Sequence, residues 1–293
     1  MVNQMIGRAL IATLMVVVAA CSESTASTSP TTSAVPSIGA SSEVLRLVVL
    51  GDSIAVPAIG CGDCTGFDEL YADHLETRTG RPVDLRNEAR PGDKIESLQA
   101  LLDSNSTVQN AIAASDIVVV SIGYNNGPPW GPGDPCHVQE VTRDADLVRA
   151  ILAMTPECIT DTIEKYRGEL NAAYGRIEEL AAARQQIRVT FGIFDSMRDN
   201  PGTDGTLRQV PPEEMESALE RFGSIIERWN AMDCVAATAH GFVCADLHHV
   251  FNGPDGTSSV GAFAAPDWIH PNEAGQAAMA KLLERVDVSA LDR

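Results

Sequence analysis

The stretch RLVVLGDSIAV, residues 46–56, decides the fold of this chain. Residues 44–50, VLRLVVL, have the composition of a strand that is buried on both faces of a parallel sheet. The apolar run ends abruptly in Gly51, Asp52 and Ser53, and apolar residues then resume. Three such residues can form an ordinary turn, or a turn that holds a serine nucleophile. The rest of the chain decides between these two interpretations.

Strand-like and helix-like segments alternate after this stretch. Further strand-like runs occur at residues 82–89, 116–123, 187–194 and 241–247. Two apolar stripes with helical spacing are expected to be core faces: Ile159, Ile163, Tyr166, Leu170, Ile177 and Leu180, then Met215, Leu219, Phe222, Ile226 and Trp229. The alternation predicts a parallel sheet with helices on both faces. Ligands of such sheets bind at the carboxyl ends of the strands.

The start of the chain has the pattern of an export signal. Residues 9–20 are continuously apolar, over a length that is typical of a signal peptide and short for a membrane span. VAAC, residues 18–21, resembles the lipobox of bacterial lipoproteins, whose cysteine becomes the lipid-modified first residue. We expect residues 1–20 to be a lipoprotein signal peptide, and Cys21 to anchor the protein on the extracytoplasmic face of the cell membrane. Ordinary secretory cleavage is the alternative.

The composition of the chain changes near residue 43, and this change predicts a tether followed by a domain. Residues 21–43 are rich in Ser, Thr and Pro and lack an apolar period, so we expect a disordered tether. Residues 44–293 then form one domain, which we expect to be a monomer. The chain of 293 residues has a formal net charge of −19. This charge argues against nucleic acid as a partner, because phosphate binding needs a surface rich in Lys and Arg.

Six cysteines remain after Cys21, and an even number in an exported chain indicates disulfides. Proximity in the sequence predicts the pairs Cys61–Cys64, Cys136–Cys158 and Cys234–Cys244. The CGDC segment of the first pair is also compatible with a redox centre or half of a zinc site. The sequence has no second C-x-x-C to complete a zinc site, so we favour a structural disulfide and expect no metal or cofactor.

Residues 126–158 interrupt the alternation of strands and helices. The segment is rich in Gly and Pro at its start and contains Cys136 and Cys158. It follows a predicted strand end, so we expect a long irregular insertion beside the substrate site.

Four polar clusters lie after predicted strands or near the end of the chain: GDS at residues 51–53, NEARPG at 87–92, GYNN at 123–126 and DWIH at 267–270. A serine hydroxyl needs a base to take its proton. Histidine suits this role, and a carboxylate fixes its tautomer. Asp267 and His270 are three residues apart, so one loop can supply both. The backbone N–H groups of Ser53 and Gly92 and the side-chain amide of Asn125 are suitable in type to hold an oxyanion.

Together the four clusters resemble the sequence blocks of the SGNH hydrolases, also called GDSL esterases and lipases. GDSI matches the nucleophile block at Ser53, and NEARPG matches the second block at Gly92. GYN matches the third block at Asn125, and DWIH matches the last block at Asp267 and His270.

The resemblance spans about residues 44–289. It implies a three-layer α/β/α sandwich with a mainly parallel five-stranded sheet, of the flavodoxin-like type, and metal-free hydrolysis of esters. Two positions depart from the family pattern. Ile54 stands where many members have Leu, and Asn126 stands where many have Asp.

We therefore predict a carboxylic ester hydrolase that works through an acyl-serine intermediate. The Ser53–His270–Asp267 triad would act on lipid, short-chain or acylated-glycan esters outside the cytoplasm. Three alternatives stay open: a non-catalytic lipoprotein of the same fold that binds glycans or lipids, an acyltransferase, and a redox protein that uses Cys61 and Cys64.

Other polar residues receive lesser roles. Asp52 is expected to hold the turn by hydrogen bonds rather than to react. Asp246 is a rival to Asp267 as the carboxylate, and we favour Asp267. His248 and His249 follow the fifth predicted strand. Consecutive strand residues point to opposite faces, which disfavours a metal site there.

Overall fold

The computed structural model describes residues 43–292 and contains one sheet of five parallel strands. The strands are β1 (Leu45–Gly51), β2 (Val83–Asn87), β3 (Ile117–Ser121), β4 (Ile187–Phe191) and β5 (Phe242–Ala245). Their spatial order is β2-β1-β3-β4-β5. All five strand-like segments of the sequence are therefore confirmed. The predicted signal peptide, Cys21 and all but the last residue of the predicted tether lie outside the described residues.

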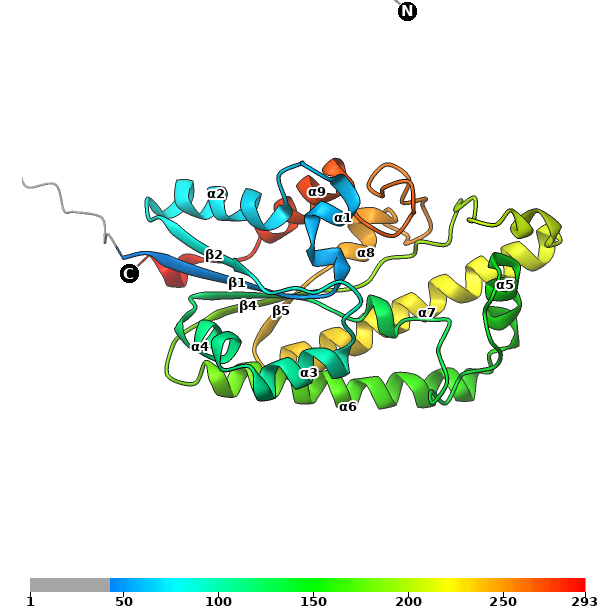
Figure 1. The fold of residues 1–293 in the computed structure, drawn as a ribbon, viewed down its shortest axis with the longest axis horizontal. Coiled ribbons are helices and arrows are strands. Elements are labelled where there is room, and N and C mark those ends of the chain that lie inside the picture. The colour runs from blue at the N-terminus through cyan, green and yellow to red at the C-terminus, as the bar shows by residue number, and fades with distance from the viewer. Residues whose placement is uncertain (1–42, 293) are drawn as a thin grey trace, which may run out of the picture. The chain divides into compact units, whose positions relative to one another are not determined.

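Helices cover both faces of the sheet (Figure 1). They are α1 (Pro57–Cys61), α2 (Phe67–Thr79), α3 (Ile95–Ser104), α4 (Ser106–Ala114), α5 (Asp144–Ala153), α6 (Pro156–Leu180), α7 (Pro212–Ala239), α8 (Leu247–Phe251) and α9 (Glu273–Leu283). Figure 1 shows α1, α2, α8 and α9 on one face and α3, α4, α6 and α7 on the other. Among the described residues, no helix is both long enough and apolar enough to cross a membrane.

Strand β1 belongs to the sheet, which is the middle layer of this three-layer sandwich. Its side chains alternate between two cores. Val48 and Leu50 belong to the core beneath α3, α4, α6 and α7. Leu45, Leu47 and Val49 belong to the core beneath α2, α8 and α9. A strand that is buried on both faces can tolerate few polar side chains, which explains the continuous apolar run of the sequence.

The predicted stripes of α6 and α7 are confirmed as core faces. Their members are buried or packed at the edge of one core. The prediction of an irregular insertion over residues 126–158 was wrong for its second half, because residues 144–153 form helix α5. Ala145, Val148 and Ile151 are buried, and α5 packs against α7 rather than against the sheet, as Figure 1 shows.

All three predicted disulfides are present: Cys61–Cys64, Cys136–Cys158 and Cys234–Cys244. The second ties the loop after β3 to the first turn of α6, and the third ties α7 to β5. The cysteines of the three pairs are 3, 22 and 10 residues apart in sequence.

The interpretation of His248 and His249 as residues on alternate faces of a strand was wrong. Strand β5 ends at Ala245. Asp246 then caps helix α8 by accepting a hydrogen bond from the His249 N–H at 3.1 Å. A capping aspartate so close to the strand end starts a helix instead of prolonging the strand.

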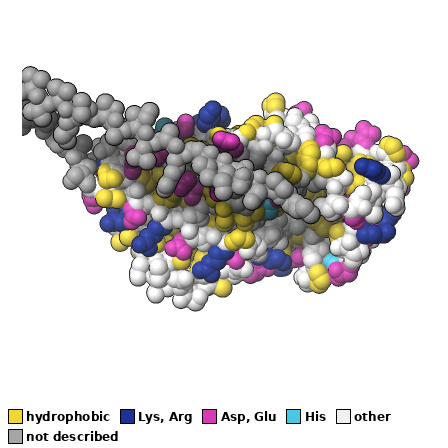
Figure 2. All heavy atoms as spheres, turned by 45° about the horizontal axis from the view of Figure 1, so that its top comes forward, with side chains coloured by type: hydrophobic (Ala, Val, Ile, Leu, Met, Phe, Trp, Pro, Cys, Tyr) yellow, Lys and Arg dark blue, Asp and Glu magenta, His cyan; other side chains and the backbone are white. Residues whose placement is uncertain are grey.

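Charges of both signs are mixed on one face of the molecule. On the face shown in Figure 2, Asp and Glu side chains are interspersed with Lys and Arg side chains, and hydrophobic side chains lie between them. Among the described residues visible in this view, the basic side chains form no continuous tract.

Candidate active site

Ser53 is the first residue of a short 3-10 helix, Ser53–Ala55, directly after β1. The chain passes from β1 to β2 on one side and then to β3 on the other side. Open parallel sheets bind ligands at such a reversal of strand order. The NEARPG loop follows β2 and the GYNN loop follows β3, so three of the four polar clusters meet at this edge of the sheet.

Gly51 allows β1 and β3 to approach closely at the turn. Its φ is 150°, and a Cβ atom at this position would collide with the carbonyl oxygen of Ser121. The Asp52 N–H donates a hydrogen bond to the same oxygen at 2.9 Å. Glycine at this position therefore has a steric reason, because any side chain would push the strands apart.

Asp52 holds the turn, as predicted. One carboxyl oxygen accepts a hydrogen bond from the Ile54 N–H at 3.0 Å, and the other accepts one from the Tyr124 N–H at 3.1 Å. The side chain is buried, and burial raises its pKa from 3.8 to about 7 in spite of these hydrogen bonds. Asp52 thus joins the turn after β1 to the GYNN loop.

Ser53, His270 and Asp267 form one chain of hydrogen-bonded side chains. His270 Nε2 lies 2.9 Å from Ser53 Oγ. His270 Nδ1 lies 2.6 Å from Asp267 Oδ2. Both distances are within the range of hydrogen bonds between a nucleophile, its base and the group that orients the base. Ser53 and His270 are 217 residues apart in sequence.

The loop that carries His270 is organised around Asp267. Asp267 Oδ1 accepts hydrogen bonds from the Ile269 and His270 N–H groups, both at 3.0 Å. Trp268, which lies between Asp267 and Ile269, has a φ of 62°, a left-handed conformation that is rare for a residue of its size. Partial burial by itself would raise the pKa of Asp267, but the hydrogen bonds from the His270 side chain and from these two N–H groups lower it below its ordinary value.

Helix α1 supports the same loop. An added Cβ atom at Gly60 would lie 2.9 Å from His270 Cβ and even closer to the Pro271 carbonyl oxygen. The Cys61–Cys64 disulfide closes the end of this helix, next to Gly60. A structural disulfide is therefore the interpretation of CGDC that the surroundings favour.

The predicted oxyanion donors lie on loops that touch each other. Asn125 Nδ2 donates a hydrogen bond to the Asp93 carbonyl oxygen at 2.9 Å, which links the GYNN loop to the residue after Gly92. A primary amide has a second hydrogen, so one donor of Asn125 remains. Among the described residues, the N–H groups of Ser53 and Gly92 have no hydrogen-bond acceptor.

The rival carboxylate Asp246 pairs with a different histidine. Asp246 and His249 are also three residues apart, so spacing alone does not separate the two candidates. His249 Nδ1 lies 2.8 Å from Asp246 Oδ2, on helix α8. The structure thus brings Asp267, and not Asp246, into the hydrogen-bonded chain that contains Ser53.

Comparison with known proteins identifies the family of the chain. The model of the GDSL-like lipase/acylhydrolase family matches residues 49–278. The chain belongs to this family. It is therefore an ester hydrolase, and both the SGNH resemblance and the predicted fold are confirmed. A search of curated proteins gave no match.

Solved structures with a similar fold include other members of this enzyme class. The lipase Lip_vut3 from a goat rumen metagenome is 18% identical, with 82% of this chain and 95% of that chain covered and a TM-score of 0.56. The extracellular lipase of Streptomyces rimosus is 18% identical, with 83% of this chain and 100% of the lipase chain covered and a TM-score of 0.56. Phospholipase A1 of Streptomyces albidoflavus NA297 is 17% identical (81% and 97% covered, TM-score 0.53).

Two asparagines of this GDSL-like hydrolase have roles that the sequence did not reveal. Asn87 Nδ2 donates hydrogen bonds to the Ala55 carbonyl oxygen and to Asp68 Oδ2, both at 2.8 Å. These bonds fix the NEARPG loop to the short 3-10 helix Ser53–Ala55, which we call the serine turn. Asn126, which departs from the family pattern, is buried and accepts a hydrogen bond from the Ile95 N–H at 2.9 Å. The position of Asn87 in a matched block was the available signal for its importance.

Proposed function

We propose that Ser53, His270 and Asp267 are the catalytic triad of a carboxylic ester hydrolase. The observation that supports this role is the continuous hydrogen-bonded chain from Ser53 Oγ through both nitrogens of His270 to Asp267 Oδ2. Asp267, whose pKa is lowered, stays ionised near neutral pH and can stabilise the imidazolium that forms during the reaction.

In the first half-reaction, Ser53 Oγ adds to the ester carbonyl carbon while its proton passes to His270 Nε2. The negative charge that develops on the carbonyl oxygen is held by the N–H groups of Ser53 and Gly92 and by the Asn125 amide. The tetrahedral species collapses as the carbon–oxygen bond to the alcohol breaks. His270 gives its proton to the departing alcohol, and an acyl-Ser53 remains.

In the second half-reaction, water repeats the attack on the acyl carbon. His270 takes one proton from water and returns it to Ser53 Oγ as the acyl bond breaks, which releases a carboxylic acid. An alcohol in place of water would give acyl transfer by the same steps. Deacylation by water defines the proposed hydrolase.

The proposed substrates are lipid, short-chain or acylated-glycan esters outside the cytoplasm. Extracellular action agrees with the apolar N-terminal segment and with the similarity to the extracellular lipase of Streptomyces rimosus. A panel of esters with graded acyl length, together with acetylated glycans, would rank the three substrate classes by kcat/KM.

Replacement of the serine tests the proposal. We expect Ser53→Ala to lower kcat for a chromogenic short-chain ester by about 10⁴-fold or more, because no other group replaces the nucleophile. The thermal unfolding curve should stay close to that of the wild type. Ser217→Ala, at an exposed position of α7, is the matched control and should keep full activity. Undiminished hydrolysis by Ser53→Ala would overturn the proposed mechanism.

We also propose that Cys21 carries the lipid anchor. Expression of Cys21→Ala should move the esterase activity from the membrane fraction to the soluble extracytoplasmic fraction. Mass spectrometry of the wild-type N-terminus should find a diacylglyceryl-modified Cys21. An unmodified Cys21, or membrane attachment that survives the substitution, would contradict the anchor.

A further inference from the structure

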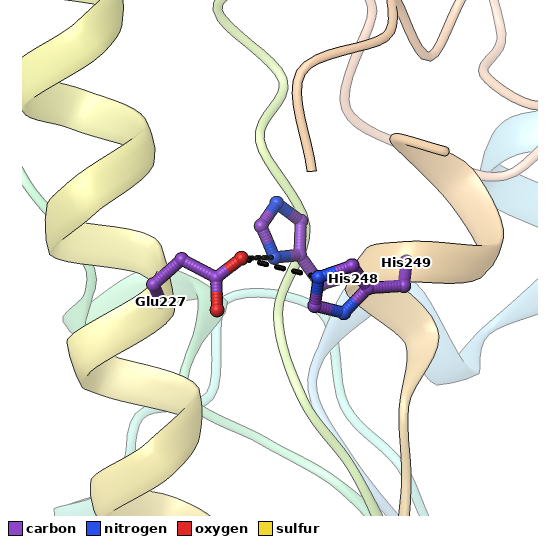
Figure 3. Close-up of side chains that lie close together, drawn as sticks. All are labelled: Glu227, His248 and His249. Carbon is purple, nitrogen blue, oxygen red and sulfur yellow. Dashed lines mark ion pairs between the residues drawn. The ribbon is translucent and has the colours of Figure 1, made fainter. Parts of the chain in front are cut away.

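Glu227, His248 and His249 form a cluster away from the serine turn, and the ester hydrolase mechanism does not use it. Glu227 belongs to helix α7, and the two histidines belong to helix α8. Figure 3 shows both imidazole rings turned toward the Glu227 carboxylate. Glu227 Oε1 lies 3.1 Å from His248 Nδ1 and 3.3 Å from His249 Nε2.

These distances suit three ligands of one metal ion. The ligand atoms of all three side chains lie within 4.8 Å of one another. Zinc binds nitrogen and oxygen ligands at about 2.0–2.1 Å in a tetrahedron, which places neighbouring ligand atoms about 3.3 Å apart. Two of the three edges of the cluster therefore match a tetrahedral site already, and the third is at most 4.8 Å long.

His249 is oriented as metal-binding histidines usually are. Its Nδ1 lies 2.8 Å from Asp246 Oδ2, which leaves Nε2 directed toward Glu227. A carboxylate behind the ring fixes the tautomer and raises the basicity of the ligating nitrogen. The Asp246 carboxylate also caps helix α8 by accepting a hydrogen bond from the His249 backbone N–H, so it is held in place independently of the imidazole ring.

His248 gives a second and independent indication. Its side chain is only 2% exposed. Neither ring nitrogen makes a hydrogen bond of normal geometry to any described residue, although Nδ1 is close to Glu227. A buried imidazole without hydrogen bonds is costly, and a metal ion bound to Nδ1 would satisfy that nitrogen.

The surroundings leave room for an ion and a path to it. Gly256 lies against the cluster, and a Cβ atom there would be 2.8 Å from His248 Cε1 and 2.9 Å from Glu227 Oε1. The cluster lines a cavity of about 320 Å³. The Glu227 side chain is 48% exposed, so an ion can enter from solvent and keep a water molecule as its fourth ligand.

We propose that Glu227, His248 and His249 bind one divalent transition-metal ion of the zinc type, which fastens helix α8 to helix α7. Two imidazoles and one carboxylate favour zinc or its neighbours over calcium and magnesium, which prefer oxygen ligands. The neighbouring Cys234–Cys244 disulfide joins α7 to β5, so the ion would reinforce the same junction. The role is structural and independent of Ser53.

Calorimetric titration of the metal-free protein, prepared without a histidine tag, tests this site. We expect one equivalent of zinc per chain to bind and to raise the unfolding temperature, while calcium does neither. Ser53→Ala should bind zinc equally well, which separates this proposal from the proposed catalytic mechanism. The absence of a saturable zinc site in the folded protein would overturn the proposal.

Single substitutions locate the ligands. His249→Gln and Glu227→Gln alter partly exposed side chains, so they should fold and should abolish stoichiometric binding. Asp246→Asn keeps the helix cap and should weaken binding by about 10–100-fold. His240→Gln is the matched control, because His240 lies 2.9 Å from the Glu178 carboxylate and this pair has no third potential ligand among the described residues. Zinc binding that survives His249→Gln, or that is lost in His240→Gln, would refute the assignment.

Discussion

At the scale of single residues, the position of His270 depends on the lack of a side chain at Gly60. Gly60 on α1 lies against His270 Cβ and the Pro271 carbonyl oxygen. A shift of the loop by a few tenths of an ångström would lengthen the 2.9 Å contact between His270 Nε2 and Ser53 Oγ. Proton transfer depends steeply on such geometry.

Gly60→Ala should therefore lower kcat/KM by about tenfold or more, with a smaller effect on KM, because it displaces the base rather than the substrate. The control is Gly168→Ala in α6, where an added Cβ atom would meet no atom within 4 Å apart from its chain neighbours and the backbone of its own helix. That variant should keep full activity and be slightly more stable, since alanine favours helices. Ester hydrolysis and thermal unfolding of both variants give the comparison, and wild-type activity in Gly60→Ala would refute the steric argument.

At the scale of elements, Asn126 joins the loop after β3 to the start of helix α3. Its Oδ1 accepts a hydrogen bond from the Ile95 N–H at 2.9 Å, and its Nδ2 donates one to Glu96 Oε2 at 3.0 Å. Asn126 is buried, so neither hydrogen bond is readily replaced by water. An amide satisfies both partners, whereas an aspartate would face the Glu96 carboxylate without a proton to donate.

Asn126→Asp should lower the free energy of unfolding by about 1–3 kcal/mol at neutral pH, because it removes a buried donor and adds a like charge beside Glu96. Glu96→Gln in the Asn126→Asp background should recover much of this loss, since the glutamine amide can donate to the new carboxylate. Urea unfolding of the two single variants and the double variant measures the coupling. Simple additivity of the two changes would contradict a direct hydrogen bond.

At the scale of the whole molecule, one buried carboxyl group makes stability depend on pH. Asp233 on α7 accepts a hydrogen bond from the Tyr174 hydroxyl of α6 at 2.6 Å. Burial raises the pKa of Asp233 from 3.8 to about 7 in the folded protein. Between these two values the folded state keeps a proton that the unfolded state has lost. The contribution of Asp233 to stability is therefore complete below about pH 4 and declines as the pH rises toward 7.

Asp233→Asn should remove this dependence, because an amide still accepts the hydrogen bond from Tyr174 but does not titrate. We expect the stability of the variant relative to the wild type to rise by about 1.4 kcal/mol per pH unit between pH 4 and 7. Denaturant unfolding at several pH values measures the difference. Asp161→Asn, at an exposed position of α6, controls for the loss of a carboxylate and should show a much weaker trend. A constant difference across this range would contradict the raised pKa.

Much of this architecture could be predicted because it depends on patterns among residues that are close in sequence. The five strands and the stripes of α6 and α7 follow from apolar periodicity, and the disulfides join cysteines that are close in sequence. Ser53, Gly92 and Asn125 could be placed at one edge because each follows a parallel strand. Helix α5 was missed because a Gly- and Pro-rich start concealed the apolar residues behind it.

The sequence by itself determined the elements, their order and the polar residue types at the strand ends. The family resemblance favoured the Asp267–His270 segment, and tertiary structure decided how it, rather than Asp246 and His249, reaches Ser53. Asp246 and His249 have the same spacing as Asp267 and His270, and both pairs form a hydrogen bond between carboxylate and imidazole. Spacing along the chain fixes the pairing within each segment. The packing of the Asp267–His270 loop against α1 brings one imidazole to the end of β1, whereas the other pair lies at helix α8, beside Glu227.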